Sequence, residues 1–196
     1  MIKVCIIGLG YVGLPILINL SKKFKPIGYD INKQRIRDLK KGKDIFNEFK
    51  KSTLKKGKVI FTSSIHSIKK SNLFIITVPT PINNNKLPDL RHLKDVCNKL
   101  SKIIKKNDII IFESTVYPGV TENICVPILE HQSGLKCSLD GFMIGYSPER
   151  INPGDKVHTL EKIVKVVAGK DAYTLEQVAT LYEQVIVSRL VNLTAG

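Results

Sequence analysis

Short apolar runs alternate along this chain with segments in which apolar residues recur every three or four positions. Short runs rich in β-branched residues are typical of buried strands, and the longer spacing is typical of helices with one buried face. Strands are therefore predicted at residues 2–7, 26–29, 59–62, 73–78, 109–112, 142–146, 162–168 and 185–187. Helices are predicted after Gly13 and at residues 33–41, 90–105, 121–130 and 174–184. This order predicts a doubly wound α/β fold, with a parallel sheet, right-handed crossovers and helices on both faces.

Single residues set some of the predicted boundaries. Gly42 is expected to end the helix at 33–41, and Asp89 is expected to cap the helix that follows it. The polar stretch 43–57 has no clear period and receives no assignment, although Ile45, Phe46 and Phe49 are candidates for packing.

The first predicted strand runs into the sequence Gly8-Leu9-Gly10-Tyr11-Val12-Gly13, a Gly-x-Gly-x-x-Gly motif that opens a helix. In a dinucleotide-binding turn, Gly8 permits the tight bend and Gly10 leaves room for a pyrophosphate. Gly13 allows the new helix to pack closely against the sheet. The free N–H groups at the start of that helix favour a bound phosphate. The motif therefore predicts a Rossmann dinucleotide site.

Asp30 follows the second predicted strand and lies 17 residues beyond Gly13. An acid at about this distance takes the ribose hydroxyls of the adenosine, and its charge repels a 2′-phosphate, so NAD is favoured over NADP. The alternative is that Asp30 only starts a turn with Asn32. Lys33 and Arg35 lie just beyond and are candidates for the ribose or phosphate edge, which leaves the choice of cofactor open on spacing alone.

Three predicted strands end in polar loops that contain proline: Pro79-Thr80-Pro81, the stretch 113–119 and the stretch 147–154. The carboxyl ends of parallel strands meet at one edge of a sheet, and ligands bind outside that edge. We therefore expect these loops to form one cleft beside the cofactor. Each loop is otherwise an ordinary turn, and Glu149 with Arg150 is otherwise a local ion pair.

The composition fits one globular domain, with 196 residues of which 43% are hydrophobic. The net charge of +14 would attract polyanions, but the lysines fall in short scattered groups without aromatic stacking residues, so a nucleic-acid binder is the least favoured hypothesis. Glycines and Pro15 interrupt the apolar N-terminal stretch, which argues against a signal peptide or a membrane span. The four cysteines lack metal-site spacing, so we expect free thiols, no bound metal and a cytoplasmic protein.

Five ordered motifs stand out: Gly-Leu-Gly-Tyr-Val-Gly-Leu-Pro at 8–15, Tyr-Asp-Ile-Asn-Lys-Gln-Arg-Ile at 29–36, Val-Pro-Thr-Pro at 78–81, Glu-Ser-Thr-Val-Tyr-Pro-Gly at 113–119 and Tyr-Ser-Pro-Glu-Arg-Ile-Asn-Pro-Gly-Asp at 146–155. Together they resemble the UDP-glucose/GDP-mannose dehydrogenase family, and the last two are most similar to its branch acting on UDP-N-acetylhexosamines. The resemblance implies oxidation of the sugar C6 alcohol to a carboxylate with two NAD, in polysaccharide biosynthesis. It also implies an aldehyde captured by a cysteine thiolate and a thioester cleaved by water.

The resemblance assigns roles to individual residues. It implies that Val12, Asp30, Arg35, Thr80 and Thr115 contact NAD, within a cofactor-binding set completed by Gly8, Gly10, Tyr11, Gly13, Pro79 and Ser114. Thr115 and Glu149 would hold the water and handle protons as the catalytic pair. The sugar nucleotide would be bound by Glu149, Arg150, Ile151 and Asn152.

In the family, a central helix with a lysine and an asparagine follows the NAD-binding domain, and the nucleophilic cysteine follows that helix. Both are expected beyond the position of Gly196. We therefore expect residues 1–196 to be the NAD-binding domain alone, without the central helix and the sugar-nucleotide domain. It should bind NAD without complete turnover, and the full-length protein is expected to be a homodimer. The competing hypothesis is a non-catalytic nucleotide-binding or regulatory module on the same fold.

Overall fold

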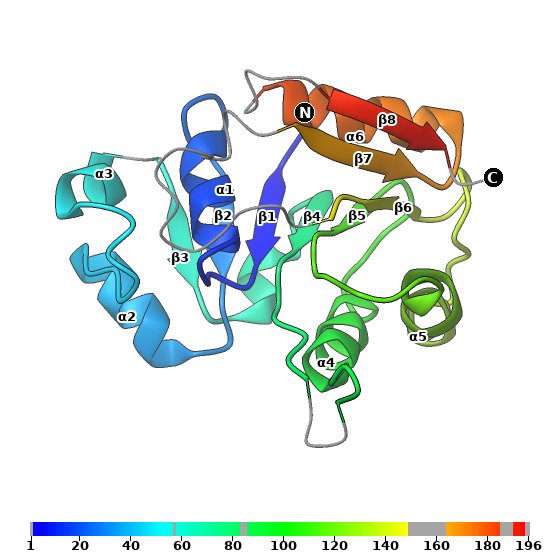
Figure 1. Ribbon diagram of the computed structural model, residues 1–196, viewed down its shortest axis with the longest axis horizontal. Helices are drawn as coiled ribbons and strands as arrows, with labels where there is room; N and C mark the ends of the chain where they lie inside the picture. The colour runs from blue at the N-terminus through cyan, green and yellow to red at the C-terminus, as the bar shows by residue number, and fades with distance from the viewer. Residues whose placement is uncertain (1, 57, 83–85, 149–163, 185–189, 195–196) are drawn as a thin grey trace.

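The computed structural model of the chain describes residues 2–56, 58–82, 86–148, 164–184 and 190–194 (Figure 1). Its strands are β1 (Val4–Ile7), β2 (Ile27–Tyr29), β3 (Ile60–Thr62), β4 (Leu73–Ile76), β5 (Ile109–Phe112), β6 (Met143–Tyr146), β7 (Lys165–Gly169) and β8 (Leu190–Thr194). Its α-helices are α1 (Gly13–Leu20), α2 (Lys33–Lys41), α3 (Lys51–Lys56), α4 (Arg91–Leu100), α5 (Val126–Ser133) and α6 (Ala172–Glu183). A 3₁₀ turn, η1, covers Ile65–Ile68, and a π-helical turn, η2, covers Thr121–Cys125.

The strands form one sheet in the order β3-β2-β1-β4-β5-β6-β7-β8. The order 3-2-1-4-5-6 is that of a doubly wound dinucleotide-binding fold, so the predicted fold class is confirmed. One pairing departs from the parallel prediction, because β6 and β7 are antiparallel, with Tyr146 opposite Ala168. The first residue of β7, Lys165, therefore lies near the carboxyl ends of β5 and β6.

Each face of the sheet covers its own hydrophobic core. Successive residues of a strand point to opposite faces. In β1, accordingly, Val4 and Ile6 join a cluster with α1, α2 and α6, whereas Cys5 and Ile7 join a cluster with α4 and α5. Figure 1 shows α4 and α5 together on one side of the sheet and α6 on the other. Burial on both faces explains why β1, β4 and β5 read as unbroken apolar runs.

Several predicted boundaries shift. The predicted strand 73–78 ends at Ile76, and the predicted helix 90–105 ends at Leu100. The prediction that Asp89 caps α4 was wrong, since Leu90 occupies the cap position; Asp89 lies one residue earlier and accepts the Arg91 N–H at 3.0 Å. The predicted helix 121–130 begins as the π turn and continues as α5 to Ser133. The predicted strand 185–187 lies outside the described residues.

None of the helices in the described part of the chain is long and apolar enough to cross a membrane.

Candidate functional site

A cavity of about 810 Å³ opens at the carboxyl edge of β1, β2, β4 and β5. This is the edge at which the sequence predicted a ligand. Most of the predicted cofactor-binding residues line it together: Gly8, Gly10, Tyr11, Val12, Asp30, Arg35, Pro79, Thr80, Ser114 and Thr115. Gly13 lies beneath the loop, at the start of α1. Glu149, Arg150, Ile151 and Asn152, predicted for substrate and catalysis, lie outside the described residues.

The three glycines of the loop are required for different structural reasons. Gly8 has a φ of +94°, which side-chain-bearing residues rarely adopt. A Cβ on Gly13 would lie 1.9 Å from the Gly8 carbonyl oxygen, so this position holds the helix tightly against the loop. A Cβ on Gly10 would meet no protein atom within 4 Å. Packing therefore explains Gly8 and Gly13, whereas the open space over Gly10 fits the close approach of a diphosphate.

The first backbone amides of α1 add an electrostatic attraction for an anion to the open space over Gly10. We call the loop at residues 8–13, together with these amides, the glycine cradle. The N-cap residue of α1, Val12, supplies no side-chain hydrogen bond, so no side chain of the cap competes for the first amides. These amides carry the positive end of the helix dipole and favour an anion. The arrangement suits the diphosphate of a dinucleotide.

Thr77 fixes the glycine loop from the neighbouring strand. Its buried hydroxyl lies 3.0 Å from the Ile7 carbonyl oxygen and 2.7 Å from that of Gly8. The sequence pattern predicts Thr77 only as part of the fourth strand. The sequence feature that could have indicated this role is a hydroxyl at the end of an otherwise apolar run. That run forms β4, which pairs with β1.

Asp30 joins the loop to the second strand. Its Oδ2 accepts the Leu9 N–H at 2.8 Å and its Oδ1 accepts the Asn32 N–H at 2.8 Å. The turn with Asn32 therefore exists alongside the predicted position at the cavity. Because a carboxylate offers about four acceptor sites, Asp30 retains capacity for two ribose hydroxyls.

The predicted cofactor residue Arg35 is bound on several sides. Its Nε donates to the Leu9 carbonyl at 2.8 Å, its Nη1 pairs with Asp44 at 2.8 Å, and its guanidinium lies 5.0 Å from the centre of the Phe46 ring. Asp44 also accepts the N–H groups of Phe46, Glu48 and Phe49. The first part of the stretch left unassigned from sequence, residues 44–49, thus folds around Asp44 and brings Phe46 to the cavity.

Two hydrogen bonds tie the loops after β4 and β5 together. The Thr80 hydroxyl donates to the Thr115 carbonyl at 2.6 Å, and the Ser114 hydroxyl donates to the Val78 carbonyl at 2.6 Å. The predicted cofactor residues Pro79, Thr80, Ser114 and Thr115 are thereby held as one wall of the cavity. Two of the three polar loops predicted to face one edge do so.

A buried charge cluster lies behind that wall. Glu113, the first residue after β5, accepts hydrogen bonds from the Lys165 ammonium and from the Tyr182 hydroxyl. The side chains of Glu113 and Lys165 are both fully buried. Lys165 Nζ also lies 3.4 Å from the Pro148 carbonyl oxygen, at the end of the described part of the third loop. No role for Glu113, Lys165 or Tyr182 is predicted from the sequence.

Burial disfavours the charged forms of Tyr29, Cys5 and Tyr146. Burial, followed by the charges of Asp30 and Cys5, raises the pKa of Tyr29. Burial also raises the pKa values of the Cys5 thiol and of Tyr146. All four cysteines are buried free thiols. Within the described residues, no group of three His, Cys, Asp or Glu side chains is placed to hold a metal.

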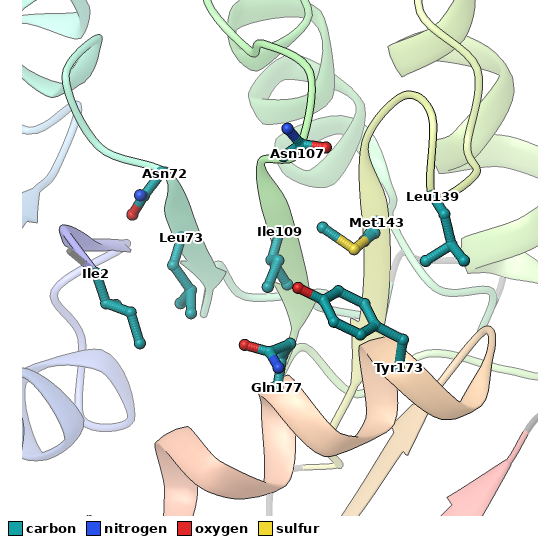
Figure 2. Close-up of a pocket in the computed structure, with 9 residues that line it drawn as sticks. All are labelled: Ile2, Asn72, Leu73, Asn107, Ile109, Leu139, Met143, Tyr173 and Gln177. Carbon is teal, nitrogen blue, oxygen red and sulfur yellow. The ribbon is translucent and has the colours of Figure 1, made fainter.

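A second cavity, of about 370 Å³, lies at the opposite edge of the sheet, by the starts of β4, β5 and β6. Figure 2 shows Tyr173 and Gln177 of α6 facing Leu73, Ile109 and Met143 across it. It has no glycine loop and no predicted site residue. The chemistry described above belongs to the larger cavity.

The sequence profile of the UDP-glucose/GDP-mannose dehydrogenase family, NAD binding domain, matches residues 2–186. The chain is 48% identical over 184 residues to protein CapL of Staphylococcus aureus, covering 94% of this chain and 43% of that protein. It is 47% identical over 186 residues to the UDP-N-acetyl-D-glucosamine 6-dehydrogenase of Salmonella typhi, covering 94% of this chain and 44% of that protein.

Among solved structures, the UDP-D-ManNAc dehydrogenase of Pyrococcus horikoshii matches with a TM-score of 0.90 and 30% identity. The match covers 99% of this chain and 47% of that one. The chain therefore spans less than half the length of each of these three relatives.

Proposed function

This chain belongs to the UDP-glucose/GDP-mannose dehydrogenase family as its NAD binding domain, and on that premise we propose that it is the cofactor half of a UDP-N-acetylhexosamine 6-dehydrogenase. The proposed reaction oxidises the C6 alcohol of the sugar to a uronic acid and reduces two NAD. The name of the Salmonella typhi relative, at 47% identity, supports this substrate class. The observation that carries the proposal is the glycine cradle with open space above Gly10, next to Asp30.

NAD supplies the hydride acceptor, and the described residues account for its binding. The amides at the start of α1 would hold the diphosphate, and Asp30 would accept hydrogen bonds from the adenosine ribose. The wall formed by Pro79, Thr80, Ser114 and Thr115 would orient the nicotinamide half, since it lies on the other side of the glycine loop from Asp30 along the sheet order. Preformed walls keep the cofactor in one orientation.

The substrate side of the proposal rests on the loops after β5 and β6. Thr115 lies at the cavity, where its exposed side chain would hold the reacting water. Glu149 would handle protons, and Arg150, Ile151 and Asn152 would bind the sugar nucleotide, as the family resemblance implies. A carboxylate beside an ordered water is a suitable general base when its pKa fits the task.

Calorimetric titration of this chain with NAD, NADP and UDP-N-acetylglucosamine tests the cofactor half. We expect NAD to bind more tightly than NADP, and Asp30→Ala to reduce NAD affinity about tenfold, by analogy with other charged hydrogen bonds. Asp38→Asn is the matched control, because Asp38 lies on α2 and pairs with Gln34. Failure of the folded chain to bind NAD would overturn the proposal.

A test of the substrate half requires the part of the relatives that this chain does not cover. We would replace the matched residues of the Salmonella typhi relative with this chain and supply UDP-N-acetylglucosamine and NAD. The expected result is a uronic acid product with two NADH formed per sugar. A chimera that folds and binds NAD but reduces none would instead favour a non-catalytic nucleotide-binding module.

We further propose that the full-length protein works as a homodimer, as the family resemblance implies, and that it is cytoplasmic, on the ground of its free cysteines. Light scattering of the full-length protein, together with fractionation of cells that express it, tests both statements. A monomer, or recovery with the membrane fraction, would contradict them.

A further inference from the structure

Two residues that line the cavity have opposite expected effects on the choice between NAD and NADP. Asp30 disfavours a 2′-phosphate, whereas an arginine close to the adenosine ribose favours one and is the usual partner of NADP. Arg35 lines the same cavity as Asp30, only five residues further along the chain. The preference for NAD therefore requires that the positive charge of Arg35 be withheld from the ligand.

Asp44 is placed to do this. Its carboxylate pairs with Arg35 Nη1 at 2.8 Å, and the side chains of the two residues are 0% and 5% exposed, respectively. With so little water between them, the two charges are weakly screened. The remaining hydrogen bond of the guanidinium in this structure runs from Nε to the Leu9 carbonyl, which draws the group toward the glycine loop.

The same carboxylate also shapes the cavity wall. Asp44 accepts the N–H groups of Phe46, Glu48 and Phe49 and so folds the loop that carries the Phe46 ring against the guanidinium. Arg35 Nη2 is buried and has no hydrogen-bond partner among the described residues. The guanidinium thus retains an unused donor beside the cavity, while its charge is matched by Asp44.

We propose that Asp44 is a second determinant of NAD over NADP, acting by neutralising Arg35. Asp44 is a positioning residue, because it acts through Arg35 and not by touching the cofactor. The proposal rests on the NAD site proposed above. It predicts that removing the charge of Asp44, while Arg35 stays, makes the cavity more attractive to a 2′-phosphate.

Direct titration of NAD and NADP into the folded chain tests this without any catalytic step. Asp44→Asn keeps the size of the side chain and one oxygen acceptor, and we expect it to raise NADP affinity relative to NAD about tenfold, as expected from one nearby charge. Asp44→Ser is the second variant if Asp44→Asn fails to fold, since its hydroxyl can still accept a backbone N–H. Asp44→Glu should keep the wild-type preference.

Two controls test whether the effect of Asp44 acts through the charge of Arg35. Adding Arg35→Met to Asp44→Asn should remove the gain for NADP, because the freed charge is then gone. Asp38→Asn removes the same charge from α2, where Asp38 accepts a hydrogen bond from Gln34 at 3.0 Å, and should leave the ratio within about twofold of wild type.

The outcomes separate the two proposals. If wild type binds no NAD, the cofactor site itself is refuted. If wild type binds NAD but a folded Asp44 variant keeps the wild-type ratio, the role of Asp44 is refuted. The same holds if Asp38→Asn gives an equal gain.

Discussion

Both ends of the cleft contain a buried ion pair, and the two pairs are built differently. At the adenosine end, Arg35 and Asp44 are nine residues apart, and Asp44 takes further hydrogen bonds from the backbone of its own loop. At the other end, Glu113 and Lys165 are 52 residues apart, and Tyr182 adds a third side chain from α6. One residue of each pair, Arg35 and Glu113, lines the cavity. The first pair is local, whereas the second joins β5, β7 and α6.

This difference indicates which property of the protein each ion pair affects, ligand preference or folding stability. A local pair joins only α2 to the loop that follows it, so altering the pair changes the structure locally. A pair between distant elements holds the tertiary structure, because each charge depends on the other for compensation inside the core. We therefore expect mutations at the adenosine end to change ligand preference, and mutations at the Glu113 end to change folding stability first.

The largest expected effect is that of Lys165→Met. It leaves the Glu113 carboxylate buried without its cation, which should lower the free energy of unfolding by about 3–5 kcal/mol, measured by urea denaturation. Adding Glu113→Gln should recover part of this loss. Lys106→Met is the control, because Lys106 pairs at 3.6 Å with Asp140, which is 97% exposed, and should cost less than about 1 kcal/mol. Equal losses of stability in Lys165→Met and Lys106→Met would contradict the structural role of the Glu113–Lys165 pair.

The next largest effect separates the glycines of the loop. Gly13→Ala forces a Cβ to within 1.9 Å of the Gly8 carbonyl oxygen and should cost about 1–3 kcal/mol or more in thermal or urea unfolding. Gly10→Ala meets no protein atom within 4 Å, so stability should stay within about 0.5 kcal/mol of wild type while NAD affinity falls. A destabilised Gly10→Ala that still bound NAD normally would contradict the division of roles.

A smaller loss of stability than those of Lys165→Met and Gly13→Ala is expected for Tyr182→Phe. It removes one hydrogen bond to Glu113 but leaves the ring and the Lys165 pair in place, so we expect a loss of about 1–2 kcal/mol. Combining it with Lys165→Met should give less than the sum of the two losses, because both act on the same carboxylate. Strict additivity would show that the three side chains do not form one unit.

Much of this architecture could be predicted from the sequence. Apolar runs and helical spacing identified β1 to β7 and the described α-helices other than α3, because burial on both faces of a sheet leaves a strong local pattern. The glycine motif and Asp30 predicted the cofactor edge for a related reason, since a tight turn followed by a helix is encoded within a few residues. Element ends were less certain, as the shortened α4 shows.

What the tertiary structure alone decided is the set of contacts between distant residues. The antiparallel pairing of β7 brings Lys165 to the carboxyl edge beside Glu113, and a parallel β7 would have placed it at the other edge. Thr77 and Asp44 likewise gain their roles only when folding brings them to the glycine loop and to Arg35. A sequence pattern records how each residue is buried, whereas the partner of a buried polar group depends on which strands and loops become neighbours.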